Sequence, residues 1–432
     1  EAHRRYGRLP WSDVLQPAIT LAEEGFAVNH YVAMMIAANY DLLSRFPESR
    51  RTFIKPSGAP LSAVRGDRLR QPELARTLRL IAQDGPEVPY HGEIARLIAE
   101  DMARHGGLID EADLARHRTR VFEPASVRYH DVEILGQLAN SGYPTVAEAL
   151  QIVEGLELNR YGFQSTEAIH LITESLRRAL VDRLRYLGDP ELAPVPLRGV
   201  VDPGYAAARR ATIDLEHATP DAGPGDPWRF EPAPAPAPAR SGTPGEGQTT
   251  HITVIDGERN MVALTSTLGG TFGSGVVIAG TGIVLNNAVT WFDPEPGAVT
   301  SIGPGKRVMS ASSPVVLLRD GQPYAALGSP GGRRVMSAIY QIIVNLVEYG
   351  LGMQAAISAP RVHSEGPVTE ISTRFPAEVL AGLEAMGHRL LPREDSLSSM
   401  HFARPNGIQI DPASGELHGG VFPFSPATAI GV

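Results

Sequence analysis

Two threonines stand where the composition of the chain changes, and their hydroxyls are candidates for nucleophilic chemistry. Thr249 precedes the β-branched run Thr250 to Ile255, and Thr267 ends the run Met261 to Thr267. The turn residues between these runs predict a hairpin with a three-residue loop at 257–259. In that register Thr249 lies opposite Thr267, with Cβ atoms about 4.5–5.5 Å apart. A regular hairpin therefore predicts a hydrogen-bonded threonine pair, which a one-residue bulge would break.

A glycine pair is the second feature that could take part in a reaction. Gly331-Gly332 lies between a strand-like run that ends at Leu327 and an amphipathic pattern that begins near Arg333. Backbone N–H groups at the start of a helix can bind an anion. The pair is therefore a candidate for stabilising developing negative charge, and its alternative role is a tight turn between a strand and a helix.

Composition and motifs exclude several other kinds of site. The 432 residues include no cysteine, which removes cysteine nucleophiles, disulfide scaffolds and thiolate metal centres. A net charge of -9 gives no basic footprint for nucleic acid. The glycine-rich segment 269–275 lacks the lysine of a phosphate-binding loop, and the chain has no Gly-x-Ser-x-Gly or His-Glu-x-x-His motif. The thirteen histidines are scattered, and we expect His251, near Thr249, to be structural.

The elements that must position these residues are of two kinds. The first half has the apolar spacing of helices, predicted at Trp11 to Glu24, Pro72 to Gln83, Gly92 to Arg104 and Ser165 to Leu187. These helices are expected to be scaffold, since they show no cluster with the spacing of metal ligands. In the second half, strand-like runs occupy Gly275 to Ala279, Gly282 to Leu285, Pro314 to Arg319 and Pro323 to Leu327, and helices are predicted at Arg333 to Tyr349 and Pro376 to Met386. This mixture predicts an α+β layered sandwich.

A proline- and glycine-rich tract separates the two halves. It runs from Asp221 to Gly247 and includes alternating Pro-Ala repeats. Such a composition cannot bury a core and predicts an exposed, partly extended strap. The threonine pair thus lies where a strap meets the first strand of a hairpin.

Motifs in both halves, in their order along the chain, resemble the gamma-glutamyltranspeptidase family. The resemblance is carried by Tyr6-Gly7 with Pro10-Trp11, Leu21 to Phe26, Tyr186 to Pro190, Thr249 to Asp256, Thr265 to Thr267, Phe272 to Val276, Gly282 to Asn287, Ser312 to Pro314, Gly328 to Gly332 and Ala359 to His363. It covers essentially the whole chain. The family's extreme amino-terminal segment is expected to precede Glu1, because the chain opens abruptly on a charged sequence.

The resemblance implies a four-layer αββα sandwich of the N-terminal nucleophile hydrolase type, made from a proenzyme that cuts itself between Gln248 and Thr249. Residues 1–248 would form an α-rich large subunit ending in the 221–247 strap, and residues 249–432 a small subunit, both within one composite domain. The freed α-amino group of Thr249 would have a pKa of about 7.7–8.0 and could serve as the base for its own hydroxyl. Before the cut this nitrogen is an amide, so cleavage would create the base.

The resemblance also implies roles for the remaining site residues. Thr249 Oγ would attack a substrate amide to form an acyl-enzyme, which water or an amine resolves, while Thr267 orients the hydroxyl. Gly331 and Gly332 would donate to the oxyanion, where one such donor contributes about 2.7–4 kcal/mol. Ser310 matches one of two serines that hold the substrate carboxylate. This chemistry needs no metal and no cofactor.

Several positions depart from the pattern that grips a γ-glutamyl group. Gly269 stands where asparagine is usual, and Ala311 replaces the second carboxylate-binding serine. Ala288 and Trp291 replace the residues that hold the ammonium, and Asp293 could substitute only if the loop shifts. A charged ammonium without a partner in a closed site costs several kcal/mol. The pocket is therefore expected to favour an acyl group without the α-amino function, while the family's carboxylate-binding arginine would lie upstream of the first residue.

Three functions follow from this reading. The first is a hydrolase or transferase of γ-glutamyl amides such as glutathione, the second an acylase with a non-glutamyl acyl group, similar to cephalosporin acylases, and the third a non-catalytic, unprocessed binding paralogue. The expected partners are a small-molecule substrate and the two subunits, without nucleic acid. No apolar run reaches the roughly 18 residues of a membrane span. Bacterial family members are commonly periplasmic or secreted, which is the expected location although this chain shows no signal peptide.

Overall fold

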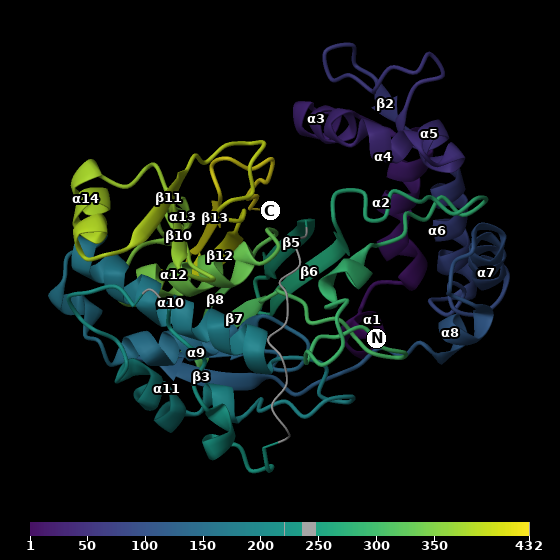
Figure 1. Cartoon of the computed structure of the whole chain (residues 1–432). Coiled ribbons are helices and arrows are strands. Elements are labelled where there is room, and N and C mark those ends of the chain that lie inside the picture. Colours follow the sequence, from purple (N-terminus) through teal and green to yellow (C-terminus); the bar gives the residue numbers. More distant parts are fainter. Residues whose placement is uncertain (220, 236–247, 432) are drawn as a thin grey trace. The chain divides into compact units, whose positions relative to one another are not determined.

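The computed structural model describes residues 1–219, 221–235 and 248–431, which form two units (Figure 1). The smaller unit consists of Glu1–Phe122 and Gly270–Asn287, and the larger unit of Glu123–Gly269 and Ala288–Val432. All residues predicted for the catalytic site belong to the larger unit.

A six-stranded antiparallel sheet lies at the centre of the larger unit, with the strand order β13-β12-β8-β7-β4-β3. Successive side chains of a strand point to opposite faces, and in β4 and β7 this buries Val132, Ile134, Val315 and Leu317. The strands are β3 (Ala125–Tyr129), β4 (Val132–Gly136), β7 (Val315–Arg319), β8 (Gln322–Gly328), β12 (Asn406–Ile410) and β13 (Leu417–Val421).

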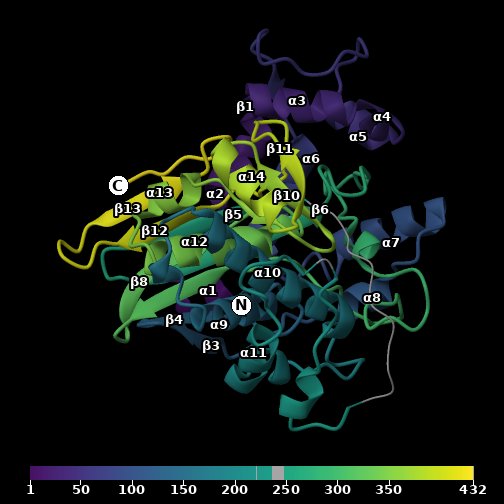
Figure 2. The same ribbon diagram turned by 60° about the vertical axis from the view of Figure 1, so that its left-hand side comes forward.

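Three long helices supply much of the core: α9 (Tyr143–Glu154), α10 (Thr166–Tyr186) and α12 (Arg334–Val347) (Figures 1 and 2). Helices α9 and α12 pack against this sheet, and α10 packs against α9. In α12 the apolar residues recur at helical spacing, so Val335, Ile339 and Ile342 are buried together. Each such side chain contributes about 1.5–3 kcal/mol when it is fully buried. This stripe fixes the helix that begins two residues after Gly332.

Smaller elements complete the larger unit. A three-stranded sheet has the order β11-β10-β9, from β9 (Val362–His363), β10 (Val368–Ser372) and β11 (Arg389–Arg393). The remaining helices are α11 (Pro203–Arg210), α13 (Met353–Ser358) and α14 (Ala377–Ala385), with short 3-10 turns η1 (Leu158–Arg160), η2 (Gly199–Val201), η3 (Pro227–Phe230) and η4 (Ala288–Trp291).

The predicted hairpin is present and has the predicted register. It consists of β5 (Gln248–Ile255) and β6 (Met261–Gly269), and Asp256 N donates to Asn260 O at 3.2 Å across the three-residue loop. The pairing continues from Ile255 opposite Met261 to Thr249 opposite Thr267. The hairpin packs against β8 and β12 of the six-stranded sheet, so β5, which carries Thr249, lies beside the strand that leads to the glycine turn.

The smaller unit is mainly helical, and two strands that the sequence predicted in it are not formed. Its elements are α1 (Ala2–Tyr6), α2 (Trp11–Glu24), β1 (Phe26–Ala27), α3 (His30–Ala38), α4 (Tyr40–Ser44), α5 (Pro47–Phe53), β2 (Arg68–Leu69), α6 (Pro72–Asp84), α7 (Glu93–His105) and α8 (Glu111–Arg116). The strands predicted at Gly275 to Ala279 and Gly282 to Leu285 were wrong, because only an isolated bridge joins Val277 to Val284. Gly275, Gly280 and Gly282 all have positive φ, which interrupts extended pairing.

The observed mixture of helices and sheets confirms the predicted α+β class. In the strap, Gly225 N donates to Asp182 Oδ1 at 2.8 Å and Tyr186 Oη donates to Gly225 O at 2.5 Å, so this point is held against α10. The rest of the predicted strap, at 236–247, lies outside the described residues. Within the described part of the chain, none of the helices has the length and apolar character to cross a membrane.

Candidate active site

The threonine pair has the geometry that the hairpin predicted. Thr249 Oγ1 donates to Thr267 Oγ1 at 3.3 Å, and Thr267 Oγ1 also accepts the N–H of Gly269 at 2.9 Å. A bulge does occur, but it lies between Gln248 and Thr249, so Gln248 pairs with Gly269. The irregularity therefore falls one residue outside the pair, and Gly269 accommodates it with a φ of 87°.

His251 lies two residues beyond Thr249 and therefore on the same face of β5. Its ring is bonded to two threonine hydroxyls, with Nδ1 2.8 Å from Thr265 Oγ1 and Nε2 3.0 Å from Thr253 Oγ1. The ring also covers Gly328, where a Cβ atom would lie 2.2 Å from His251 Cε1. The imidazole thus ties the strand that carries Thr249 to the end of β8, which leads to the glycine turn.

Burial of His251 has a consequence for stability against pH. Desolvation lowers its pKa from 6.5 to about 4, because its neighbours are neutral hydroxyls and the charged imidazolium would be costly in this site. The unfolded chain therefore binds the proton more readily than the folded protein. Neutral His251 makes its full contribution to the free energy of unfolding above pH 6.5. As the pH falls towards 4, the free energy of unfolding decreases by about 3 kcal/mol on account of this residue.

The expected result is a free energy of unfolding that falls between pH 7 and pH 4, with a shallower fall in a His251→Gln variant. Urea unfolding at a series of pH values measures both curves. His388, whose pKa burial also lowers to about 4, is present in both proteins, so the difference between the curves isolates His251. Parallel curves would contradict the assignment.

The Gly331-Gly332 turn begins α12 as predicted. Gly331 has a φ of 144° and Gly332 a φ of 56°, and their carbonyls accept Arg334 N at 3.3 Å and Val335 N at 3.2 Å. The N–H groups of the turn are therefore at the positive end of a helix. Arg333 forms an ion pair with Glu365, which anchors the turn on the side of β9.

Ser310 lies on a loop that is bonded to the start of α9. Ser310 N donates to Asn140 O at 3.2 Å, and Ser310 Oγ accepts Ser312 N at 3.0 Å. Ser310 and Ala311 are half-buried. The loop therefore presents one hydroxyl where the family pattern has two.

Comparison with known proteins identifies the family of this chain. A model of the gamma-glutamyltranspeptidase family, described as "Gamma-glutamyltranspeptidase", matches residues 1–423. The chain belongs to this family. Its relatives include "Acylase ACY 1 proenzyme" of a Pseudomonas species, which is 39% identical over 397 residues, covering 90% of this chain and 67% of the relative.

Other members of the family carry different names. "Glutathione hydrolase proenzyme" of Escherichia coli is 34% identical over 437 residues, covering 98% of this chain and 71% of the relative. The crystal structure of a cephalosporin acylase from Bacillus halodurans superposes with a TM-score of 0.85 at 29% identity, covering 98% of this chain and 74% of that one. The chain is thus a hydrolase of a family whose members include both glutathione hydrolases and acylases.

Three of the positions that depart from the family pattern lie on the segment from residue 288 to residue 293. Asp293 is buried, its Oδ1 accepts Glu295 N at 2.9 Å, and it pairs with Ser301 in an isolated bridge. The carboxylate therefore has a structural bond within its own loop. Ala288 and Trp291 are the ends of η4.

A buried group of possible metal ligands joins α10, which was predicted to be scaffold only, to the residue that precedes β11. Ligand atoms of His170, Glu174 and His388 lie within 4.8 Å of one another. The oxygens of Glu174 already accept from Arg177 at 2.8 Å and Arg178 at 2.6 Å, and His170 Nδ1 is 2.8 Å from His388 Nε2. This arrangement fits a hydrogen-bonded ionic cluster better than a metal centre.

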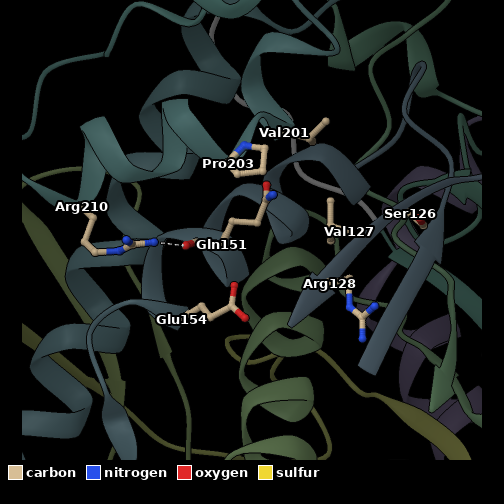
Figure 3. A pocket seen from close by; sticks show the side chains of 8 residues that line it. All are labelled: Ser126, Val127, Arg128, Gln151, Glu154, Val201, Pro203 and Arg210. Atoms are coloured by element: carbon tan, nitrogen blue, oxygen red, sulfur yellow. Dashed lines mark hydrogen bonds between the residues drawn. The ribbon is translucent and has the colours of Figure 1, made fainter. Parts of the chain in front are cut away.

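A pocket of about 330 Å³ lies apart from the predicted catalytic residues, none of which lines it. It lies between β3, the end of α9 and α11 (Figure 3). Arg210 crosses its edge and donates to Gln151 O at 2.7 Å and Ile152 O at 2.9 Å, which caps the carboxyl end of α9. Arg210 therefore stabilises the end of this helix.

Replacing Thr267 by valine tests the orienting hydrogen bond. Valine keeps the shape of the side chain but removes the acceptor of the Thr249 hydroxyl, so turnover is expected to fall about tenfold with little change in KM. A Thr253→Val variant, which loses a hydroxyl four pairs further along the hairpin, is the matched control. An equal loss in both variants would assign the effect to the strand instead of to the pair.

Proposed function

We propose that this chain is a self-processing hydrolase and acyltransferase with Thr249 as its nucleophile. In this proposal residues 1–248 and 249–432 become the large and small subunits of one composite four-layer αββα sandwich. The observation that carries the proposal is the 3.3 Å pair of Thr249 and Thr267 hydroxyls at the end of the strap.

The reaction would proceed in two balanced halves. The α-amino group of Thr249, free after cleavage, takes the hydroxyl proton as Oγ bonds to the carbonyl carbon of the substrate amide. The N–H groups of Gly331 and Gly332 hold the oxyanion that forms. The intermediate collapses to an acyl-threonine as the C–N bond breaks, and the departing amine receives the proton. Water or an acceptor amine then attacks the ester carbonyl and gives a proton to the α-amino group; the C–Oγ bond breaks, Oγ takes that proton, and a carboxylic acid or a new amide is released.

The proposed substrates are γ-glutamyl amides such as glutathione, in line with the names of several relatives. A second candidate is an acylase that takes a non-glutamyl acyl group. It is favoured by Ala288 and Trp291, which offer no charge to a substrate ammonium, and by the 39% identical acylase. Gly269, Ser310 and Asp293 remain candidate contacts of the acyl group.

Comparison of three anilide donors tests the substrate. The processed protein is offered γ-glutamyl, glutaryl and fatty-acyl p-nitroanilides, and kcat/KM is measured for each. A preference for γ-glutamyl supports a glutathione hydrolase, and a preference for glutaryl supports the acylase. If instead the chain stays uncut on a denaturing gel during incubation and this uncut chain turns over none of the three donors, the third function, a non-catalytic binding protein, replaces both.

A further inference from the structure

Strand β3 is the last strand of the six-stranded sheet, and among the described strands it pairs only with β4. A two-residue loop joins the two strands, so the pair that closes the loop, Tyr129 opposite Val132, exchanges both of its hydrogen bonds. Hydrogen-bonded pairs then alternate along the hairpin. The alternation includes Val127 and excludes Ser126 and Arg128.

The N–H and C=O groups of Ser126 and Arg128 therefore point away from β4. Within the described residues they form no backbone hydrogen bond on that side, and both residues are exposed. A row of unpaired backbone groups is a template for another extended chain. Because the two residues are two apart, they can exchange four hydrogen bonds with an antiparallel partner.

The pocket of about 330 Å³ reaches this open edge. Ser126, Val127 and Arg128 line it in a row. Since successive side chains point to opposite faces, a cavity that meets all three lies at the edge of the strand. On the face of Val127, where β3 contacts α9, the apolar wall is completed by Val201 and Pro203. The volume is in the range of pockets that bind small ligands.

The carboxyl end of α9 supplies acceptors at one end of the pocket. Glu154 Oε1 accepts His130 N at 2.9 Å, so this carboxylate lies beside the carboxyl end of β3. Gln151, which is 7% exposed, lines the same pocket, and its Oε1 is buried without a partner among the described residues. An unmade bond of this kind costs about 1–3 kcal/mol. The terminal torsion of a glutamine is soft, so Oε1 can turn towards a ligand.

The cation already present at this end of α9 leaves these acceptors to a ligand. Arg210 donates to the carbonyls Gln151 O and Ile152 O, and Glu154 forms no ion pair within the described residues. In Figure 3, Gln151 and Glu154 lie between Arg210 and β3. The negative end of the helix dipole adds to the preference of this corner for a positive charge.

We propose that the open edge of β3 and this pocket bind the amino end of an extended peptide that runs antiparallel to β3. The ammonium group of the peptide meets Glu154 and Gln151. Its first residue pairs with Arg128 and its third residue with Ser126, through main-chain hydrogen bonds that any sequence can make.

The second residue of the peptide determines the sequence preference. It lies opposite Val127, and opposed side chains of an antiparallel pair share a face. Its side chain therefore enters the wall formed by Val127, Val201 and Pro203, and an apolar residue is expected there. None of the residues predicted for catalysis lines this pocket, so the site goes beyond the proposed reaction.

Three peptides and the unaltered protein test the proposal by calorimetric titration. Ala-Val-Ala amide is expected to bind. Its N-acetyl form, which lacks the ammonium, is expected to bind about 10- to 100-fold more weakly, and Ala-Asp-Ala amide more than tenfold more weakly, because its carboxylate would enter the apolar wall. No binding of Ala-Val-Ala amide, or equal affinity for its acetylated form, overturns the proposal without any variant.

A Glu154→Gln variant locates the ammonium. It is expected to weaken Ala-Val-Ala amide about 10- to 100-fold and the acetylated peptide less than about threefold, since only the first of them carries the charge that Glu154 meets. Equal losses for the two peptides would show that Glu154 does not contact the ammonium, and would overturn the assignment.

Ser126→Pro and Ser126→Ala form a matched pair for the edge of the strand. Proline removes an N–H that faces away from the ladder, a position where edge strands tolerate it, and thermal unfolding checks that the fold is kept. Proline is expected to weaken the peptide about 3- to 10-fold, and alanine to leave the affinity unchanged. Equal affinities of the two variants would overturn the edge pairing. Because binding is measured and not turnover, failure of the proposed reaction leaves this test intact.

Discussion

A Thr249→Ala protein is expected to remain a single uncut chain and to show no measurable turnover. Alanine removes the hydroxyl that the proposed cleavage and the proposed acyl transfer both need as nucleophile, so both reactions should stop together. Loss of a covalent nucleophile commonly costs about 10⁴-fold or more in turnover. Denaturing gel electrophoresis during prolonged incubation measures the first effect, and release of p-nitroaniline measures the second.

Thr249→Ser is the control for this experiment, because serine keeps the hydroxyl and would gain the same α-amino base. Partial cleavage and measurable turnover are expected from it. Thr249 Oγ1 donates a hydrogen bond to Thr267 Oγ1 at 3.3 Å. Because serine lacks only the methyl group of threonine, its hydroxyl can still make this contact. A processed Thr249→Ala protein that still hydrolyses its donor would place the nucleophile elsewhere.

Gly331→Ala is expected to lower kcat by about 10²- to 10³-fold, the usual effect of losing one oxyanion donor. The reason is steric, since a Cβ atom at Gly331 would lie 2.5 Å from Ala403 Cβ and the φ of 144° strains any side chain. The turn must then shift, and its N–H groups with it. Steady-state kinetics with a fixed donor, alongside thermal unfolding, separates the loss of rate from a loss of fold.

Gly350→Ala provides the matched control for this turn. Gly350 also has a positive φ, of 64°, but it follows the other end of α12 and a Cβ there meets nothing within 4 Å. It carries the backbone strain of about 1–3 kcal/mol without touching the turn. Equal losses of kcat in both variants would show that general strain, and not displacement of the oxyanion donors, is responsible.

Local patterns in the sequence were sufficient to predict the hairpin and its threonine pair. The loop at 257–259 fixes the register, and the alternation of β5 follows from it, so Thr249 opposite Thr267 needed no tertiary information. The long helices were predicted for a similar reason. α2 begins and ends at the predicted residues, Trp11 and Glu24, because a helix of that length displays its apolar period several times.

Features that depend on distant contacts could not be read in the same way. Arg210 caps α9 through carbonyls that lie 58 and 59 residues before it in the chain, and in the sequence nothing distinguishes it from the other arginines. His251 was expected to be structural, but its packing over Gly328 could not be predicted, because that contact depends on the packing of β5 against β8. The strands β3 and β4, at 125–136, were missed because they are short and complete a sheet whose other strands come from the second half.

The bulge between Gln248 and Thr249 bears on the energetics of activation. Regular pairing in β5 starts at Thr249 and runs to Ile255, so the ladder that holds the nucleophile lies wholly on one side of the proposed scissile bond. Among the described residues, cutting that bond frees from the ladder only the Gln248–Gly269 pair. The precursor and the mature enzyme should therefore melt at nearly the same temperature, and maturation would alter the protonation chemistry of one nitrogen while leaving the architecture as it was.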